Sequence, residues 1–184
     1  RDALDAAMRV FWAAGYDGAS VDRLCRETAM PRASLYHDYG GKEGLFLAAV
    51  AHYVDTRIGP VARALGPKGS LAEDLTAFFS AVIALATGDN TTPGCLISCV
   101  LADAAGTSDT FRAELEDRFQ ALEDRVADRL AIDGAPRHDP RTDARAAMIA
   151  AVARGLMLRA RSGAGPESLS GIAAVTVDSV TRSA

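Results

Sequence analysis

The chain has 184 residues, of which 49% are hydrophobic and 24% are charged, and its formal net charge is −4. This composition is typical of a globular protein with a sizeable core and excludes a strongly basic chain, so any nucleic-acid site must be a local patch. Three cysteines are too few for a disulfide framework, and the longest nearly apolar run is too short to cross a bilayer. No charged-then-apolar leader opens the sequence, so we expect a cytoplasmic protein with reduced thiols and no membrane partner.

The hydrophobic pattern is helical almost throughout, and no stretch alternates apolar and polar residues for long enough to indicate a strand. Ser20 is a natural N-cap, and Pro31 suits a first helical turn because its missing N–H is not needed there. Gly15 and the Gly59-Pro60 pair should end or kink helices. The sequence therefore predicts an all-α fold of about nine helices, the first three short, near residues 2–14, 21–28, 31–39, 42–58, 70–86, 95–105, 108–132, 141–161 and 166–182.

A short turn joins the second and third expected helices, and the first helix would stabilise the pair, as in a helix-turn-helix DNA-binding unit. In the third helix the inward-packing residue would be Leu35, and the outward-facing residues would be Arg32, Ala33, Ser34 and His37. Small side chains at Ala33 and Ser34 would let the helix backbone enter a major groove. A guanidinium such as that of Arg32 can bond a guanine edge at two points.

Phosphate contacts are expected from three side chains with hydrogen-bond donors, namely Ser34, Tyr36 and Lys42. The N-terminus of the fourth helix adds free N–H groups and the positive end of a helix dipole. However, residues 1–52 carry six basic and seven acidic side chains. Affinity for DNA is therefore expected to be modest and strongly dependent on salt.

The same stretch contains a recognisable sequence pattern. A serine or threonine is followed by Leu-Tyr, then after two residues by an aromatic residue, and after two more by Lys-Glu. In this chain these residues are Ser34-Leu35-Tyr36, Tyr39 and Lys42-Glu43. Over residues 1 to about 55 the chain resembles the N-terminal signature of the tetracycline-repressor (TetR) family of bacterial transcription regulators. The resemblance implies a third helix that reads double-stranded operator DNA, C-terminal helices that form an effector pocket, and two last helices that form a homodimer. With the N-terminus of the second helix included, the implied DNA-binding residues are Ser20, Arg32, Ala33, Ser34, Tyr36, His37 and Lys42.

We expect residues 1–52 to form the DNA-binding domain and residues 53–184 to form the effector-binding and dimerisation domain. Small side chains on the last two helices suggest close approach to a second copy, and they are Ala147, Ala151, Gly155 and Ala173. The expected pocket wall is apolar without an inward-facing charge, which favours an uncharged or weakly polar small-molecule effector of unknown identity. Its predicted residues are Phe79, Ile83, Cys95, Cys99, Phe119 and Met148.

Other interpretations stay open from the sequence. A helical small-molecule carrier or enzyme could share this fold, although no nucleophile elbow or His-centred catalytic grouping is seen and we expect no enzyme. A redox or electrophile sensor could use Cys95 and Cys99, although such cysteines are more often small buried hydrophobes. A regulator of this family could also activate transcription. Because His37, His52 and His138 are scattered, no metal site and no cofactor are expected.

Overall fold

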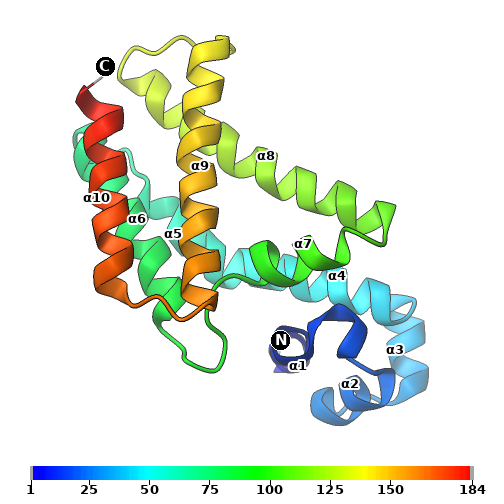
Figure 1. Ribbon diagram of the computed structural model, residues 1–184. Coiled ribbons are helices and arrows are strands. Elements are labelled where there is room, and N and C mark those ends of the chain that lie inside the picture. The colour runs from blue at the N-terminus through cyan, green and yellow to red at the C-terminus, as the bar shows by residue number, and fades with distance from the viewer. Residues whose placement is uncertain (1, 183–184) are drawn as a thin grey trace.

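The computed structural model describes residues 2–182, which form helices and connecting loops without any strand (Figure 1). The prediction of an all-α fold is confirmed. Where consecutive segments without a break are counted together, these residues form nine helical runs, as expected. The segments are α1 (Asp2–Gly18), α2 (Val21–Thr28), α3 (Arg32–Tyr39), α4 (Lys42–Tyr53), η1 (Val54–Ile58), α5 (Gly59–Ala64), α6 (Leu71–Thr87), η2 (Ile97–Leu101), α7 (Ala102–Ala104), α8 (Asp109–Ile132), α9 (Pro140–Arg161) and α10 (Pro166–Arg182).

Local signals set the boundaries of the first three helices. The backbone leaves helical geometry at Gly15, whose φ of 70° is accessible to glycine at little cost. Ser20 caps α2, since its hydroxyl accepts a hydrogen bond from the backbone N–H of Arg23 at 3.2 Å. Ala29 ends α2 in the left-handed region, and Gly40 ends α3 in the same way. These stops hold α2 and α3 as two short, separately oriented helices.

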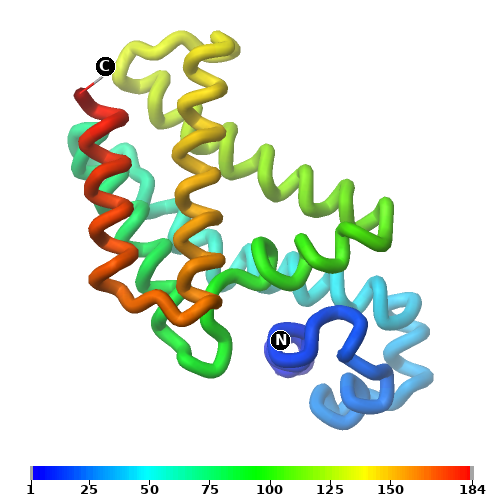
Figure 2. The backbone as a smooth tube through the Cα atoms, viewed as in Figure 1, coloured from blue at the N-terminus to red at the C-terminus, as the bar shows by residue number. Residues whose placement is uncertain are grey.

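The fourth helix continues further than the sequence indicated. The Gly59-Pro60 pair was expected to end or kink it, but α4, η1 and α5 follow one another without a break. The turn before the proline is π-helical, that is, wider than an α-turn. Pro60 lacks an N–H and its ring would crowd the carbonyl one turn earlier, and the wider turn accommodates it. One long helical run therefore links the N-terminal helices to the rest of the molecule, as the tube in Figure 2 shows.

An aromatic cluster joins the N-terminal and C-terminal parts of the chain. The ring of Phe46 on α4 lies 4.8 Å from that of Phe11 on α1 and 5.2 Å from that of Phe111 at the start of α8. Tyr16 completes the cluster with a ring centroid 4.7 Å from that of Phe111. Such edge and tilted contacts add to the free energy of burying the rings. The two parts of the chain therefore share one continuous core.

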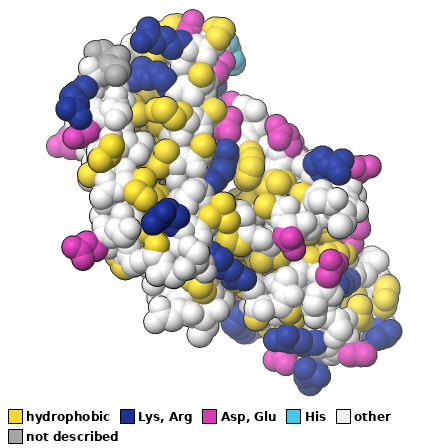
Figure 3. Space-filling view, viewed as in Figure 1, with side chains coloured by type: hydrophobic (Ala, Val, Ile, Leu, Met, Phe, Trp, Pro, Cys, Tyr) yellow, Lys and Arg dark blue, Asp and Glu magenta, His cyan; other side chains and the backbone are white. Residues whose placement is uncertain are grey.

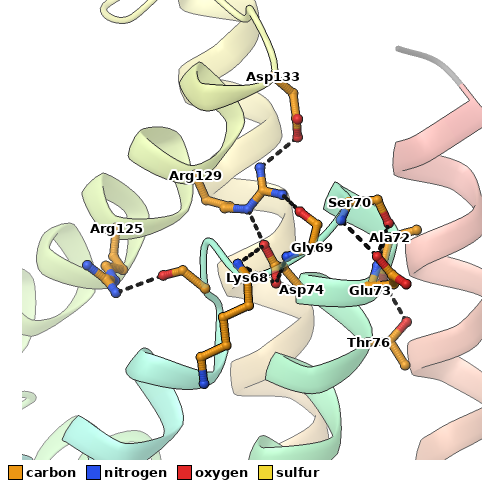
Figure 4. Close-up of polar contacts among 11 residues, drawn as sticks. Lys68, Gly69, Ser70, Ala72, Glu73, Asp74, Thr76, Arg125, Arg129 and Asp133 are labelled. Atoms are coloured by element: carbon orange, nitrogen blue, oxygen red, sulfur yellow. Dashed lines mark hydrogen bonds and ion pairs between the residues drawn. The ribbon is translucent and has the colours of Figure 1, made fainter.

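A buried ion pair fixes the loop before α6 against α8 (Figure 4). The Nε of Arg129 donates to Asp74 Oδ2 at 2.7 Å, and the same guanidinium donates to Asp133 and to the carbonyl of Gly69. Asp74 also accepts from the backbone N–H groups of Lys68 and Gly69. Burial raises the pKa of Asp74, but its hydrogen bonds outweigh burial and hold that pKa below its ordinary value. The network supplies hydrogen-bond partners to the charged groups of Arg129 and Asp74, whose side chains are each at least 96% buried.

Candidate nucleic-acid interface and ligand cavity

Helices α2 and α3 form one end of the molecule, away from α9 and α10 (Figure 1). On α3 the side chain of Leu35 is completely buried, while Arg32, Ala33, Tyr36 and His37 are exposed. Ser34 is half-buried at the edge of this exposed face. Arg32, Ala33 and His37 are exposed as the sequence predicted, whereas Ser34 is exposed only in part. Contact of each residue with DNA stays a prediction.

The two side chains expected to read bases are already engaged with carboxylates. Arg32 Nη2 lies 2.6 Å from Asp22 Oδ1 on α2, and His37 Nδ1 lies 2.8 Å from Asp38 Oδ1. The hydrogen bond from Arg32 to Asp22 raises the pKa of this guanidinium above its ordinary value. Sequence reasoning missed the pairing with Asp22 because the two residues are ten positions apart and meet only when α2 and α3 pack together. A base edge would therefore have to share the guanidinium of Arg32 with Asp22 or displace that carboxylate.

Two of the predicted phosphate donors, Tyr36 and Lys42, are close to the N-terminus of α4 in space or in sequence. Tyr36 is 51% exposed, and its ring lies so close to Gly41 that a Cβ there would be 3.3 Å from it. Lys42 Nζ lies 4.4 Å from the centroid of the Tyr16 ring and donates to the carbonyl of Asp17 at 3.4 Å. Gly41 caps α4 without a side-chain hydrogen bond. The Tyr36 ring therefore lies against the turn that begins α4, while the Lys42 ammonium group lies at the end of α1.

A cavity lies among the helices of the C-terminal part. About 80 Å³ within it is accessible to the centre of a water molecule. Residues from η1, α5, α6, η2, α8 and α9, and from the loop before η2, contribute to its wall. They are Ile58, Val61, Ala62, Phe78, Val82, Cys95, Ile97, Ser98, Arg118, Phe119, Leu122, Ala153, Arg154 and Met157.

The predicted wall differs in part from this one. Two of the predicted residues, Cys95 and Phe119, line the cavity. The other four do not, and these are Phe79, Ile83, Cys99 and Met148. On α6 the neighbouring side chains of Phe78 and Val82 face the cavity instead. One position along a helix turns a side chain by roughly 100°, so a shift of one residue moves it to another face.

The cavity also differs from the predicted wall in its methionine and in its charge. Met148 is 46% exposed, and Met157, more than two turns further along α9, supplies the methionine of the wall. No inward-facing charge was expected, yet Arg118 and Arg154 both line the cavity. Long arginine stems can cover apolar surface while their charged ends pair with carboxylates, here Glu114 and Glu123.

The surroundings of Cys99 do not favour a reactive thiol. Cys95 is buried, and Cys25 and Cys99 are half-buried. Burial raises the pKa of the Cys99 thiol, and this effect exceeds the opposing influence of Arg161. A raised pKa lowers the thiolate fraction at neutral pH and hence the reactivity. The thiol-sensor interpretation therefore gains no support from the environment of Cys99.

The small residues predicted at a dimer interface divide into two groups. Ala151 is exposed, and Ala147 and Gly155 are half-buried on α9. Ala173 is only 7% exposed within its own chain, so its side chain is not available on the surface as predicted. The same two helices instead expose larger apolar side chains, Leu158 on α9 and Val175 on α10. Hydrophobic side chains are scattered over this face in Figure 3.

Residues 2–182 contain neither a metal site nor a membrane-spanning helix. No group of three or more histidine, cysteine, aspartate or glutamate side chains is arranged to hold a metal ion. In the same range no helix combines the length and hydrophobicity needed to cross a bilayer.

A first helix and two short ones, the last with an exposed polar face, followed by a larger helical part with a cavity, are the architecture of a helix-turn-helix DNA-binding regulator. Residues 3–49 match the family model of bacterial regulatory proteins of the tetR family. Residues 72–175, more than half of the chain, match the C-terminal domain of LmrA/YxaF-like transcriptional regulators. The chain belongs to the TetR family of bacterial transcription regulators.

Individual relatives agree with this assignment along nearly the whole chain. The HTH-type transcriptional repressor ComR of Escherichia coli (strain K12) is 28% identical over 180 residues, which are 95% of this chain and 85% of ComR. A cysteine mutant of the TetR family regulator CifR, complexed with 26-bp double-strand operator DNA, is 28% identical with a TM-score of 0.85 and covers 97% of this chain and 95% of its own. The regulator SCO4454 from Streptomyces coelicolor shares the fold with a TM-score of 0.83 at 22% identity, over 99% of this chain and 87% of its own.

Proposed function

We propose that this regulator is a homodimeric repressor that binds a palindromic operator through α3 and releases it when a small molecule fills the cavity. One observation carries the proposal. On α3 the side chain of Leu35 is buried in the core, while the polar side chains of Arg32, Tyr36 and His37 are exposed. ComR, a relative along nearly the whole chain, is named a repressor, and the related CifR mutant is complexed with operator DNA. Action on DNA in the cytoplasm, without enzymatic activity, follows from the same proposal.

We assign residues 1–52 to DNA binding and residues 53–184 to effector binding and dimerisation. The run of α4, η1 and α5 crosses this boundary without a break. Ile58, Val61 and Ala62 from that run belong to the cavity wall. A ligand that pushes on these three residues would therefore act on the helix that begins beside the DNA-binding face. It changes DNA affinity only if it binds the two positions of that helix with different affinities.

The outward face of α9 and α10 is the proposed dimer interface. It exposes Ala151, Leu158 and Val175, and half-exposes Gly155. Apolar side chains together with small ones allow two helices from each copy to pack closely. Two-fold symmetry would then place the two α3 helices in successive major grooves, about 34 Å apart.

Selection of bound DNA from a random pool with the full-length protein tests this function. We expect enrichment of an inverted repeat whose half-sites are centred about one helical turn apart. A pool that shows no enriched sequence at physiological salt would rule out specific operator binding.

A reporter gene placed behind the selected sequence then separates repression from activation. Expression should fall when the protein is produced and should rise again with an effector. Expression that rises on production of the protein would instead identify an activator.

A further inference from the structure

The cations predicted to contact DNA differ in the kind of partner that holds them. Arg32 is paired with the carboxylate of Asp22. His37 is paired with the carboxylate of Asp38. In the described part of the chain the ammonium group of Lys42 forms no such pair with a carboxylate. A carboxylate partner fixes a cation but also offsets its charge, so Lys42 is held in a way that the other two are not.

Two neutral groups hold the Lys42 ammonium group instead. Its Nζ lies 4.4 Å from the centroid of the Tyr16 ring, which is a cation–π distance. The same nitrogen donates to the backbone carbonyl of Asp17 at 3.4 Å. A ring and a carbonyl attract a cation through their partial charges and leave its net charge in place. The ammonium group is therefore localised without being neutralised.

This ammonium group stays accessible from solvent. Lys42 is only half-buried, and its hydrogen bond to Asp17 lies in an exposed position. An ammonium group has three N–H donors, and this bond uses one of them, so donors remain for a phosphate oxygen. Ser20, the exposed N-cap of α2 and another predicted DNA contact, follows Asp17 closely in the chain. The end of α1 therefore connects two of the predicted contacts.

The Tyr16 ring has a fixed place because of the residues around it. Gly15, with φ 70° and ψ 175°, interrupts the helical path of α1, so Tyr16 and Asp17 belong to a separate turn after the break. The Tyr16 ring centroid lies 4.7 Å from that of Phe111 on α8 and 5.2 Å from that of Phe46 on α4. Such packed rings hold one another in orientation. Tyr16 therefore offers the cation a rigid support.

We infer, on the basis of the proposed function, that Tyr16 is a positioning residue for DNA binding, because its ring holds the Lys42 ammonium group ready for a phosphate. Tyr16 acts in this role through Lys42. A long side chain that is ordered in advance loses less conformational entropy when it binds. The role depends on the electron-rich face of an aromatic ring, and a core position filled by any large apolar side chain would not supply it.

A double-mutant cycle on the selected operator tests the inference. Tyr16→Leu removes the aromatic face, and operator affinity should fall about threefold, the order of magnitude for ordering one long side chain at an interface. In the Lys42→Met background the same change should have no further effect, since the cation that the ring holds is absent. Tyr16→Phe keeps the ring and should bind as the unaltered protein does. Fluorescence anisotropy gives the four dissociation constants of the cycle and that of Tyr16→Phe.

A second comparison separates the charge of the ring from its size, and it serves also if Tyr16→Leu does not fold. A trifluorinated phenylalanine in place of Tyr16 nearly preserves the ring shape but withdraws negative charge from its face, so affinity should fall about threefold below that of Tyr16→Phe. The same analogue in place of Phe111, whose ring packs on Tyr16 and not on the ammonium group, should leave affinity unchanged. Circular dichroism melting shows that each protein is folded.

Two outcomes would overturn the inference alone. If Tyr16→Leu weakens operator binding equally with and without the Lys42 ammonium group, Tyr16 acts only through the fold. If the trifluorinated ring supports binding as tight as that of Tyr16→Phe, the charge of the ring face has no role. A selection that enriches no DNA sequence is a different result, because it would refute the proposed function and this inference with it.

Discussion

Arg32 and His37 face a competition between the protein and DNA, because each is already paired with a carboxylate in the free protein. Both pairs are exposed, so they are weak and screened by salt. Even so, Asp22 and Asp38 place negative charge beside the surface that should approach phosphates. The N-terminal unit therefore combines specific donors with a local field that does not favour DNA, which keeps nonspecific binding low.

Asp22→Asn should strengthen operator binding. The substitution frees Arg32 and removes one negative charge from the DNA-facing side of α2. We expect affinity to rise on the order of threefold to tenfold, because exposed ion pairs contribute little. Glu27→Gln changes the net charge equally on the same helix without touching Arg32, so it controls for the general field. Fluorescence anisotropy with the selected operator measures both, and an equal gain in the two variants would remove any special role for Asp22.

Lys42→Met should weaken binding to every sequence by a similar factor. Lys42 is the first residue of α4, and its ammonium group, which lies over the Tyr16 ring, can pair with a phosphate but reads no base. Loss of one phosphate contact should reduce the slope of log affinity against log salt by about 0.9. Arg32→Ala, in contrast, should relax the preference at one base position of the selected site. A Lys42 variant with an unchanged salt slope would exclude the phosphate contact.

Among the helices, the Asp74–Arg129 pair makes a pH-dependent contribution to stability. The pKa of Asp74 lies below its ordinary value of 3.8, so the folded state holds the carboxylate ionised more strongly than the unfolded state. The contribution is therefore fully present above about pH 4 and is lost as the pH falls through the folded pKa. At neutral pH the whole contribution of the Asp74–Arg129 pair to stability is present.

Asp74→Asn should cost about 3 kcal/mol in the free energy of unfolding at pH 7, because Arg129 stays buried after losing one of its two carboxylate partners. The acid-dependent part of the stability should be smaller in this variant, so the two proteins should converge below pH 4. Asp128→Asn removes the carboxylate of an exposed pair on α8 and should cost less than 1 kcal/mol. Urea unfolding at several pH values gives these numbers. A constant difference between Asp74→Asn and the unaltered chain at all pH values would contradict the prediction.

Helices and their caps were predictable from the sequence, whereas the partners across helices were not. Ser20 and Gly15 act through their nearest neighbours in the chain, so local rules place them. The cavity wall depends on the rotation of α6 and α9 about their axes, and hydrophobic spacing cannot separate Phe78 from Phe79 when both are buried. Arg154 on α9 pairs with Glu123 on α8, and the two residues are 31 positions apart in the sequence. Only the packed structure brings such groups together.

At the scale of the whole molecule, several contacts tie the DNA-binding end to the cavity. Trp12 Nε1 donates to the carbonyl of Pro93 at 3.3 Å. Pro93 lies two positions before Cys95, which lines the cavity. The ring of Trp12 also meets that of Tyr53 at the end of α4, with centroids 5.2 Å apart. Because of these contacts and the aromatic cluster of Phe11, Tyr16, Phe46 and Phe111, a movement of the cavity wall should displace α1 and α4 as well. A rearrangement between two packed states, rather than a gradual deformation, is therefore the expected response to an effector.

Assembly is the last property that the whole molecule should show. Gly155 lies on the outward side of α9, and a Cβ added there would meet no atom of the surrounding structure within 4 Å. Gly155→Arg should therefore leave the fold of one chain intact but place a bulky charge in the proposed interface, where a desolvated and unpaired guanidinium is costly. Light scattering should then report half the molar mass of the unaltered protein, and operator affinity should fall by about a hundredfold or more because the two half-sites are no longer bound as a unit. Ala113→Arg adds the same side chain to an exposed position near the start of α8, away from that face, and should stay dimeric. A Gly155→Arg variant that remains a dimer would move the interface to another surface.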